Sequence, residues 1–126
     1  MPEPIISVPS VDGSRPQLSA DGHSFVIKEW RGSGPSEMHV HHLDDEAWHV
    51  LEGSLHFRLG DHELDAPAGS TVFVPAGVAH TYRAHDARYL LIVPPRLAAL
   101  IAELQSTREH ATHAAIYRKY ESTLLE

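Results

Sequence analysis

Cysteine is absent from this chain of 126 residues. Its absence excludes disulfide bonds, a thiol nucleophile, iron–sulfur clusters and every zinc site that is built from cysteine. Basic residues are few, since 10 Lys and Arg stand against 17 Asp and Glu, and the formal net charge is -7. This balance argues against a nucleic-acid partner, because binding to the phosphate backbone needs clustered Lys and Arg.

Long apolar segments are missing as well. The longest run without a polar side chain, Val72 to Ala79, is far shorter than the roughly 20 residues that a membrane-spanning helix needs. The first Lys or Arg of the chain is Arg15, and the N-terminus shows neither the basic nor the apolar region of a secretory signal. We therefore expect a cytoplasmic protein without a membrane partner.

The length and the turn-forming residues predict one domain with a segment appended at each end. Residues 1–23 are rich in proline and glycine and predict an irregular N-terminal arm. In residues 24–94, short runs of β-branched and aromatic residues alternate with Gly and Pro turns, which predicts an all-β barrel or sandwich. Residues 95–126 change to helical spacing and predict a C-terminal helical extension. Its two apolar stripes are Leu97, Leu100, Ile101 and Leu104, and then Ile116, Tyr120 and Leu124.

Histidine is the unusual feature of the composition, with 11 copies. His39 and His41 lie two residues apart in an expected strand, so their side chains face the same side. Such a pair alone, in a histidine-rich chain, is more often at the surface than on a metal. Glu46, at the start of the next expected strand, and His80, just after a Pro–Gly turn, add a carboxylate and a third imidazole. This set predicts a mononuclear site for iron, manganese, nickel, copper, cobalt or zinc, with positions left open for a substrate.

The spacing of these residues resembles the two sequence motifs of the cupin superfamily. The first motif is a His-x-His pair followed by a glutamate and a glycine. The second is a glycine followed by Pro-x-Gly and a histidine. The positions in register with the motifs are His39, His41, Glu46, Gly53, Gly69, Pro75, Gly77 and His80. The resemblance implies a cupin double-stranded β-helix, which is a jelly-roll barrel of the RmlC-like kind. It also implies that the metal ligands are His39, His41, Glu46 and His80.

The chain departs from the motifs at two positions that are not ligands in the family. Gly34 precedes His39 by four intervening residues where the pattern has five, and Ala84 stands where the second motif ends in asparagine. Because neither position is a ligand, the ligand set is complete. The departures concern only local turn geometry and one structural hydrogen bond. His42 is adjacent to His41 but faces the opposite side of the strand, and we expect it beside the site or at the surface.

Strand alternation outward from the ligands also predicts a pocket. An inward Glu46 places Trp48 inward, an inward His80 places Tyr82 inward, and Phe57 lies on the inner face of its own strand. We expect Trp48, Phe57 and Tyr82 to line an aromatic pocket beside the metal. Tyr82 could donate a hydrogen bond to a bound oxygen, and Glu46 could act as both ligand and catalytic base.

Three functions remain open for such a site. The preferred hypothesis is a dioxygenase-type oxidoreductase that acts on a small phenolic or enolizable substrate. The aromatic pocket favours it, and so does the segment from Ile116 to Tyr120, which is weakly similar to the tail of bacterial quercetin dioxygenase-like cupins. The first alternative is a metal-dependent isomerase, decarboxylase or lyase without redox chemistry. The second is a non-catalytic cupin that binds a small molecule. The resemblance also implies a homodimer.

Overall fold

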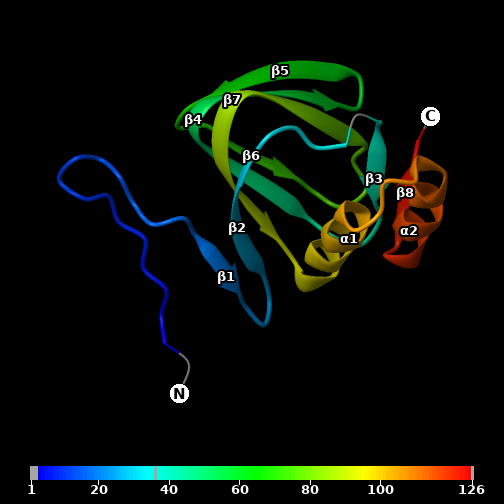
Figure 1. Ribbon diagram of the computed structural model, residues 1–126. Helices are drawn as coiled ribbons and strands as arrows, with labels where there is room; N and C mark the ends of the chain where they lie inside the picture. The colour runs from blue at the N-terminus through cyan, green and yellow to red at the C-terminus, as the bar shows by residue number, and fades with distance from the viewer. Residues whose placement is uncertain (1–2, 36, 126) are drawn as a thin grey trace.

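The computed structural model describes residues 3–35 and 37–125. Within those residues the chain forms an antiparallel β-barrel with helices at one end, as Figure 1 shows. The strands are β1 (Ser19–Asp21), β2 (Val26–Arg31), β3 (His39–His41), β4 (Glu46–Leu59), β5 (His62–Pro67), β6 (Thr71–Val74), β7 (His80–Val93) and β8 (Ser122–Leu124). The helical segments are α1 (Pro95–Gln105), the 3-10 turn η1 (His110–Thr112) and α2 (His113–Lys119). The all-β barrel and the C-terminal helix predicted from the sequence are confirmed.

Strands β4 and β7, each 14 residues long, organise the barrel. They pair with each other antiparallel, while β4 also pairs with β5 and β6, and β7 also pairs with β2 and β3. Register shifts between Val50 and Ser54 mark the place where the long ladder bends. Gly53 has a φ of 69° in this bend, and a side chain on it would overlap the backbone of Asp86. The bend therefore depends on a glycine at this position.

The core fills the barrel with alternate residues of the long strands. On β4 the inward side chains have no exposed surface: Trp48, Val50, Leu55 and Phe57. On β6 the side chains of Val72 and Val74 are buried, whereas Phe73 between them is 61% exposed. The alternation expected of a half-buried strand is thus present on both strands.

The C-terminal extension differs in one respect from the predicted pair of helices. The second helix ends at Lys119, and Glu121 then adopts a φ of 58°. The chain continues as strand β8, which pairs antiparallel with β3. Leu124 therefore belongs to a strand and not to the expected helical stripe. The physical reason is that the edge of β3 offers backbone hydrogen-bonding groups, and an added strand satisfies them where a helix would not.

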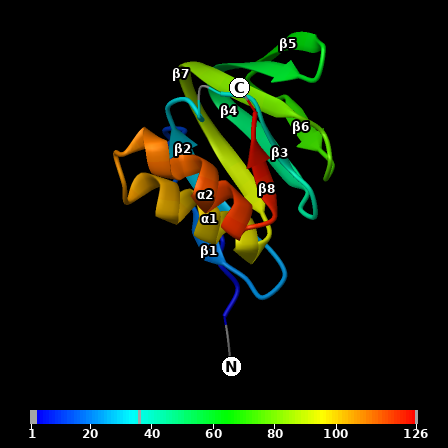
Figure 2. The same ribbon diagram turned by 90° about the vertical axis from the view of Figure 1, so that its right-hand side faces the viewer.

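Helices α1 and α2 lie together at one end of the barrel, while the N-terminal arm runs away from it (Figures 1 and 2). Arg96, at the start of α1, donates hydrogen bonds of 2.8 and 3.0 Å to the carboxylate of Asp44. Asp44 is only 6% exposed and lies in the loop between β3 and β4. This ion pair fixes the start of α1 next to the loop that leads into Glu46. None of the helices in the described ranges has the length and the apolar run needed to cross a bilayer.

Docking of α1 on the barrel can be tested through Leu97, which has no exposed surface and belongs to the main core. We expect Leu97→Ala to lower the free energy of unfolding by about 2–5 kcal/mol, because it removes buried methyl groups and leaves a cavity. Leu43→Ala is the matched control, since Leu43 is 60% exposed and its loss should change stability by less than about 0.5 kcal/mol. Urea denaturation measures both. Equal effects would contradict the docking of α1.

Candidate metal centre

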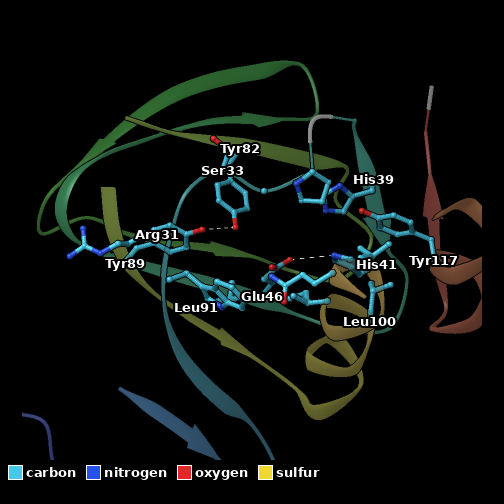
Figure 3. A pocket seen from close by; sticks show the side chains of 16 residues that line it. Arg31, Ser33, His39, His41, Glu46, Tyr82, Tyr89, Leu91, Leu100 and Tyr117 are labelled. Carbon is cyan, nitrogen blue, oxygen red and sulfur yellow. Dashed lines mark hydrogen bonds and ion pairs between the residues drawn. The ribbon is translucent and has the colours of Figure 1, made fainter. Parts of the chain in front are cut away.

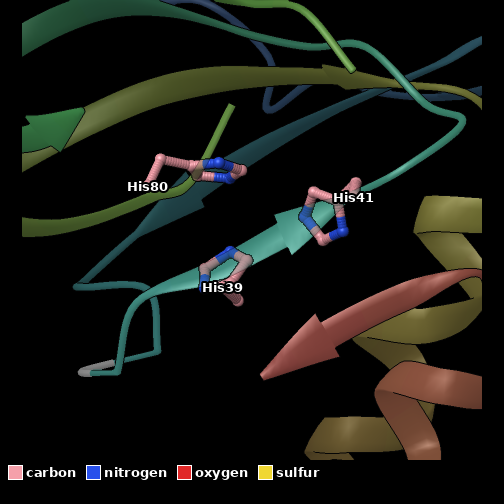
Figure 4. A group of neighbouring side chains, drawn as sticks. All are labelled: His39, His41 and His80. Carbon is pink, nitrogen blue, oxygen red and sulfur yellow. The ribbon is translucent and has the colours of Figure 1, made fainter. Parts of the chain in front are cut away.

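Three imidazoles meet where β3 runs beside the first residue of β7. His39 and His41 lie on β3, and His39 is directly opposite His80 in the antiparallel pair. The ring centroids are 4.4 Å apart for His39 and His80, 5.0 Å for His39 and His41, and 5.1 Å for His41 and His80. One ring nitrogen of each residue lies within 4.8 Å of the others, so the triad could hold a metal ion (Figure 4).

The Nδ1 atom of each imidazole has a partner of its own. Nδ1 of His39 is 3.1 Å from the carbonyl oxygen of Glu37, and Nδ1 of His80 is 2.9 Å from that of Val78. A carbonyl can only accept, so both imidazoles carry a proton on Nδ1. A hydrogen bond on one nitrogen fixes the ring and leaves the other nitrogen, Nε2, as the ligand atom.

The third imidazole is held by the C-terminal extension. Nδ1 of His41 lies 2.8 Å from the hydroxyl of Ser122 on β8. That hydroxyl donates its own proton to the carbonyl oxygen of Tyr120 at 3.2 Å, so it accepts from His41. Nε2 of His41 is therefore also left to face the cluster. The sequence did not predict Ser122 as a partner of His41, because Ser122 lies 81 residues later in the chain and belongs to no motif.

A carboxylate completes the cluster. Oε1 of Glu46 is 3.1 Å from Nε2 of His80 and 3.3 Å from Nε2 of His41. Two imidazole nitrogens and a carboxylate oxygen thus converge on one point, with His39 beside them. Imidazole and carboxylate donors suit divalent transition metals. The residues present therefore fit the ion that the sequence predicted, with His39, His41, Glu46 and His80 as the group that would hold it.

Burial sets the protonation of two members of this cluster. Burial lowers the pKa of His39 to about 3, and the neighbouring imidazoles of His80 and His41 add to the effect. Burial alone would raise the pKa of Glu46, but its close contacts with Nε2 of His41 and of His80 outweigh burial and lower that pKa to about 2. Near neutral pH, His39 is neutral and Glu46 is ionised. Both are the forms that bind a metal.

A cavity of about 320 Å³ opens onto the cluster (Figure 3). Its polar floor includes His39, His41 and Glu46, and its walls are mainly aromatic and aliphatic. The sheet supplies Trp30, Tyr82, Tyr89 and Leu91, and the C-terminal extension supplies Leu100, Ile101, Leu104 and Tyr117. The cavity is therefore closed on one side by residues from outside the barrel.

The predicted pocket residues separate into two groups. Tyr82 lines the cavity, but its hydroxyl is 2.9 Å from that of Tyr89, which itself donates to the carbonyl oxygen of Gly32 at 2.8 Å. The proton of Tyr82 is thus directed at Tyr89, away from a bound molecule. Trp48 and Phe57 have no exposed surface and pack behind Tyr82, at ring distances of 5.3 and 5.6 Å. Strand alternation gives the inward direction of a side chain but not its depth in the barrel, so both belong to the core.

The remaining histidines lie outside this cluster. His42 is exposed and is hydrogen-bonded to Thr123 of β8 at 2.8 Å, which agrees with its expected outward direction. His110 forms an ion pair with Glu37, and its ring is 4.9 Å from that of His113. Among the residues that the structure describes, the triad on β3 and β7 is the one group of three or more ligating side chains.

The role of Ser122 leads to the first prediction for this site. We expect Ser122→Ala to weaken metal binding roughly 10–100-fold, because His41 loses the group that orients its ring. Thr123→Val is the matched control on the same strand, since the hydroxyl of Thr123 bonds to the exposed His42 and not to a member of the cluster. Competition with a chromophoric chelator measures both affinities. An unchanged affinity in Ser122→Ala would contradict this role.

The low pKa of His39 leads to a second prediction, for the metal-free protein. The unfolded chain takes up a proton on this residue below about pH 6.5, whereas the folded chain does so only near 3. The contribution of His39 to stability is therefore complete above pH 6.5 and is lost as the pH falls toward 3. In urea denaturation with a chelator present, we expect the wild type to lose more stability between pH 7.5 and pH 4.5 than His39→Gln. Parallel pH profiles would show that His39 is not buried in its neutral form.

Comparison with known proteins agrees with the geometry. The family model described as a cupin domain matches residues 23–93, more than half of the chain. An uncharacterized protein of Streptomyces coelicolor is 32% identical over 86 residues, which cover 67% of this chain and 82% of that protein. KdgF from Halomonas sp. is similar in structure with a TM-score of 0.52 and 16% identity, over 60% of this chain and 74% of that one. The polyketide cyclase RemF from Streptomyces resistomycificus has a TM-score of 0.49 and 26% identity, over 58% and 56%. By its sequence match and its barrel, the chain belongs to the cupin domain family.

Proposed function

We propose that this cupin is a metal-dependent enzyme of the dioxygenase type that acts on a small phenolic or enolizable molecule. The observation that carries the proposal is the position of three members of the ligand cluster, His39, His41 and Glu46, at the floor of the 320 Å³ cavity, under aromatic and aliphatic walls. Cavities of this kind bind small organic molecules and orient them with a few polar groups. We propose His39, His41, Glu46 and His80 as the residues that hold the ion.

The ion supplies Lewis acidity toward a substrate oxygen when bound and, if it is redox-active, one-electron chemistry. The side chains that line the cavity determine the shape of the substrate that it can bind. Trp30, Tyr82 and Tyr89 offer ring surfaces to a flat substrate. Leu100 and Leu104 of α1 line the same space and add apolar surface to it. A flat molecule with one or two oxygen groups is the substrate that this combination of walls and floor selects.

Glu46 has two tasks in this proposal, in a definite order. A pKa of about 2 keeps Glu46 ionised, which is the form that binds an ion. Its first task is to hold the ion, and its second is to receive the proton that a phenol or enol gives up as it binds.

Oxygen consumption tests the proposal. We expect protein reconstituted with iron, manganese, nickel or copper to consume oxygen with a flavonol, a catechol or a β-diketone. Glu46→Gln should reduce the rate roughly 100-fold or more, because it removes both a charged ligand and a base. Glu63→Gln is the control: Glu63 lies on the outside of β5 and pairs with His56, so the rate should not change.

Two results would contradict the dioxygenase assignment. With the metal bound, no oxygen consumption across the three substrate classes would exclude it for those substrates. Turnover that proceeds equally without oxygen would show instead that the same cluster acts as a Lewis acid, as in an isomerase, a decarboxylase or a lyase.

A further inference from the structure

Tyr117 brings a hydroxyl group from the C-terminal extension to the ligand cluster. It lies on α2, outside the barrel, yet it lines the cavity. Its ring centroid is 5.4 Å from that of His39 and 6.5 Å from that of His41, and it is stacked on His41 at an interplanar angle of 16°. Figure 3 shows the hydroxyl end of the ring directed toward the two imidazoles.

The Tyr117 hydroxyl is buried without a partner. The residue is 1% exposed, and among the described residues no group forms a hydrogen bond with its hydroxyl oxygen. The hydroxyls of three other tyrosines differ: Tyr82 and Tyr89 bond to each other, and Tyr120 donates to Glu103 at 2.6 Å. A buried hydroxyl without a hydrogen bond is costly to the folded state. The cost is removed when a bound molecule supplies the acceptor.

The hydroxyl is a donor under ordinary conditions. A tyrosine hydroxyl has an ordinary pKa of about 10, so it keeps its proton near neutral pH. Since the proton of Tyr82 is already directed at Tyr89, Tyr117 is the tyrosine of this cavity whose proton is free to reach a ligand.

We propose that Tyr117 donates a hydrogen bond to an oxygen atom of the molecule bound beside His39 and His41. This rests on the proposed function, because it takes the occupant to be a phenol, an enol or another carbonyl compound. The acceptor is the ionised phenolate or enolate oxygen, or a carbonyl oxygen that gains negative charge during the reaction. Tyr117 is then a catalytic residue that comes from the extension and not from the barrel motifs. The only sequence signal for it is the tail segment from Ile116 to Tyr120.

The test uses the full chain loaded with zinc, which is redox-silent, and 4-nitrocatechol, whose ionisation is visible by absorbance. We expect Tyr117→Phe to bind 4-nitrocatechol roughly 10–100-fold more weakly than the wild type, as for loss of a hydrogen bond to a charged oxygen. The pH midpoint for ionisation of the bound catechol should rise, because the donor stabilises the anion. Zinc content should be unchanged, and the melting temperature of the ligand-free protein should not fall.

Tyr120→Phe is the matched control on the same extension. Tyr120 bonds to Glu103 outside the cavity, so its loss should leave both the affinity and the ionisation midpoint unchanged. A merely structural role for Tyr117 would not move the ionisation midpoint of the ligand.

The outcomes separate this inference from the proposed function. Equal affinity and equal ionisation midpoints in the wild type and Tyr117→Phe would overturn the role of Tyr117 alone. Loss of zinc or of folding in Tyr117→Phe would also overturn it, since the hydroxyl would then support the unliganded site. Failure of the zinc-loaded wild type to bind 4-nitrocatechol would overturn the phenolic substrate class, and the role of Tyr117 with it.

Discussion

The pairing of the three-residue strand β3 with β7 on one edge and β8 on the other is the interaction on which the site depends. Pairing with β7 sets His39 opposite His80, and pairing with β8 sets His41 opposite Ser122. Backbone hydrogen bonds thus set the relative positions of the residues that carry the imidazoles, independently of side-chain packing. The turn before β7 is tied to the same strand, because Gly77 donates to the carbonyl oxygen of His41 at 2.8 Å. An extension of the barrel, β8, is therefore part of the candidate metal centre.

The cluster illustrates how buried polar groups are tolerated in an otherwise apolar barrel. Transfer of imidazoles and a carboxylate out of water is unfavourable unless each group is paired. Here every Nδ1 atom of the triad has an oxygen partner, and Oε1 of Glu46 lies 3.1 and 3.3 Å from the Nε2 atoms of His80 and His41. The polar groups that remain point at one another and toward the cavity. A cation at this point would satisfy all of them together, which is why the arrangement fits a metal and not a hydrophobic ligand alone.

The sequence predicted what depends on local spacing and missed what depends on distant chain segments. The His-x-His pair, Glu46 and the turn before His80 are local patterns, and they predicted the barrel and the residues that meet at the cluster. Ser122 and Tyr117 come from a segment near the C-terminus, and no periodicity could place it beside β3. Strand alternation put Trp48 inside the barrel but could not tell a cavity wall from the core. Likewise, the β-strand after α2 arises from an available sheet edge, not from local propensity.

The central claim is that one divalent ion is held by three imidazoles and Glu46. Metal content by mass spectrometry, on tag-free protein reconstituted with a first-row metal and dialysed, tests it most directly. The account predicts close to one ion per chain in the wild type and in His110→Ala, which changes a histidine outside the cluster. It predicts near-complete loss of the ion in His80→Ala. A wild type that retains no ion, or a His80→Ala variant that retains as much as the wild type, would contradict it.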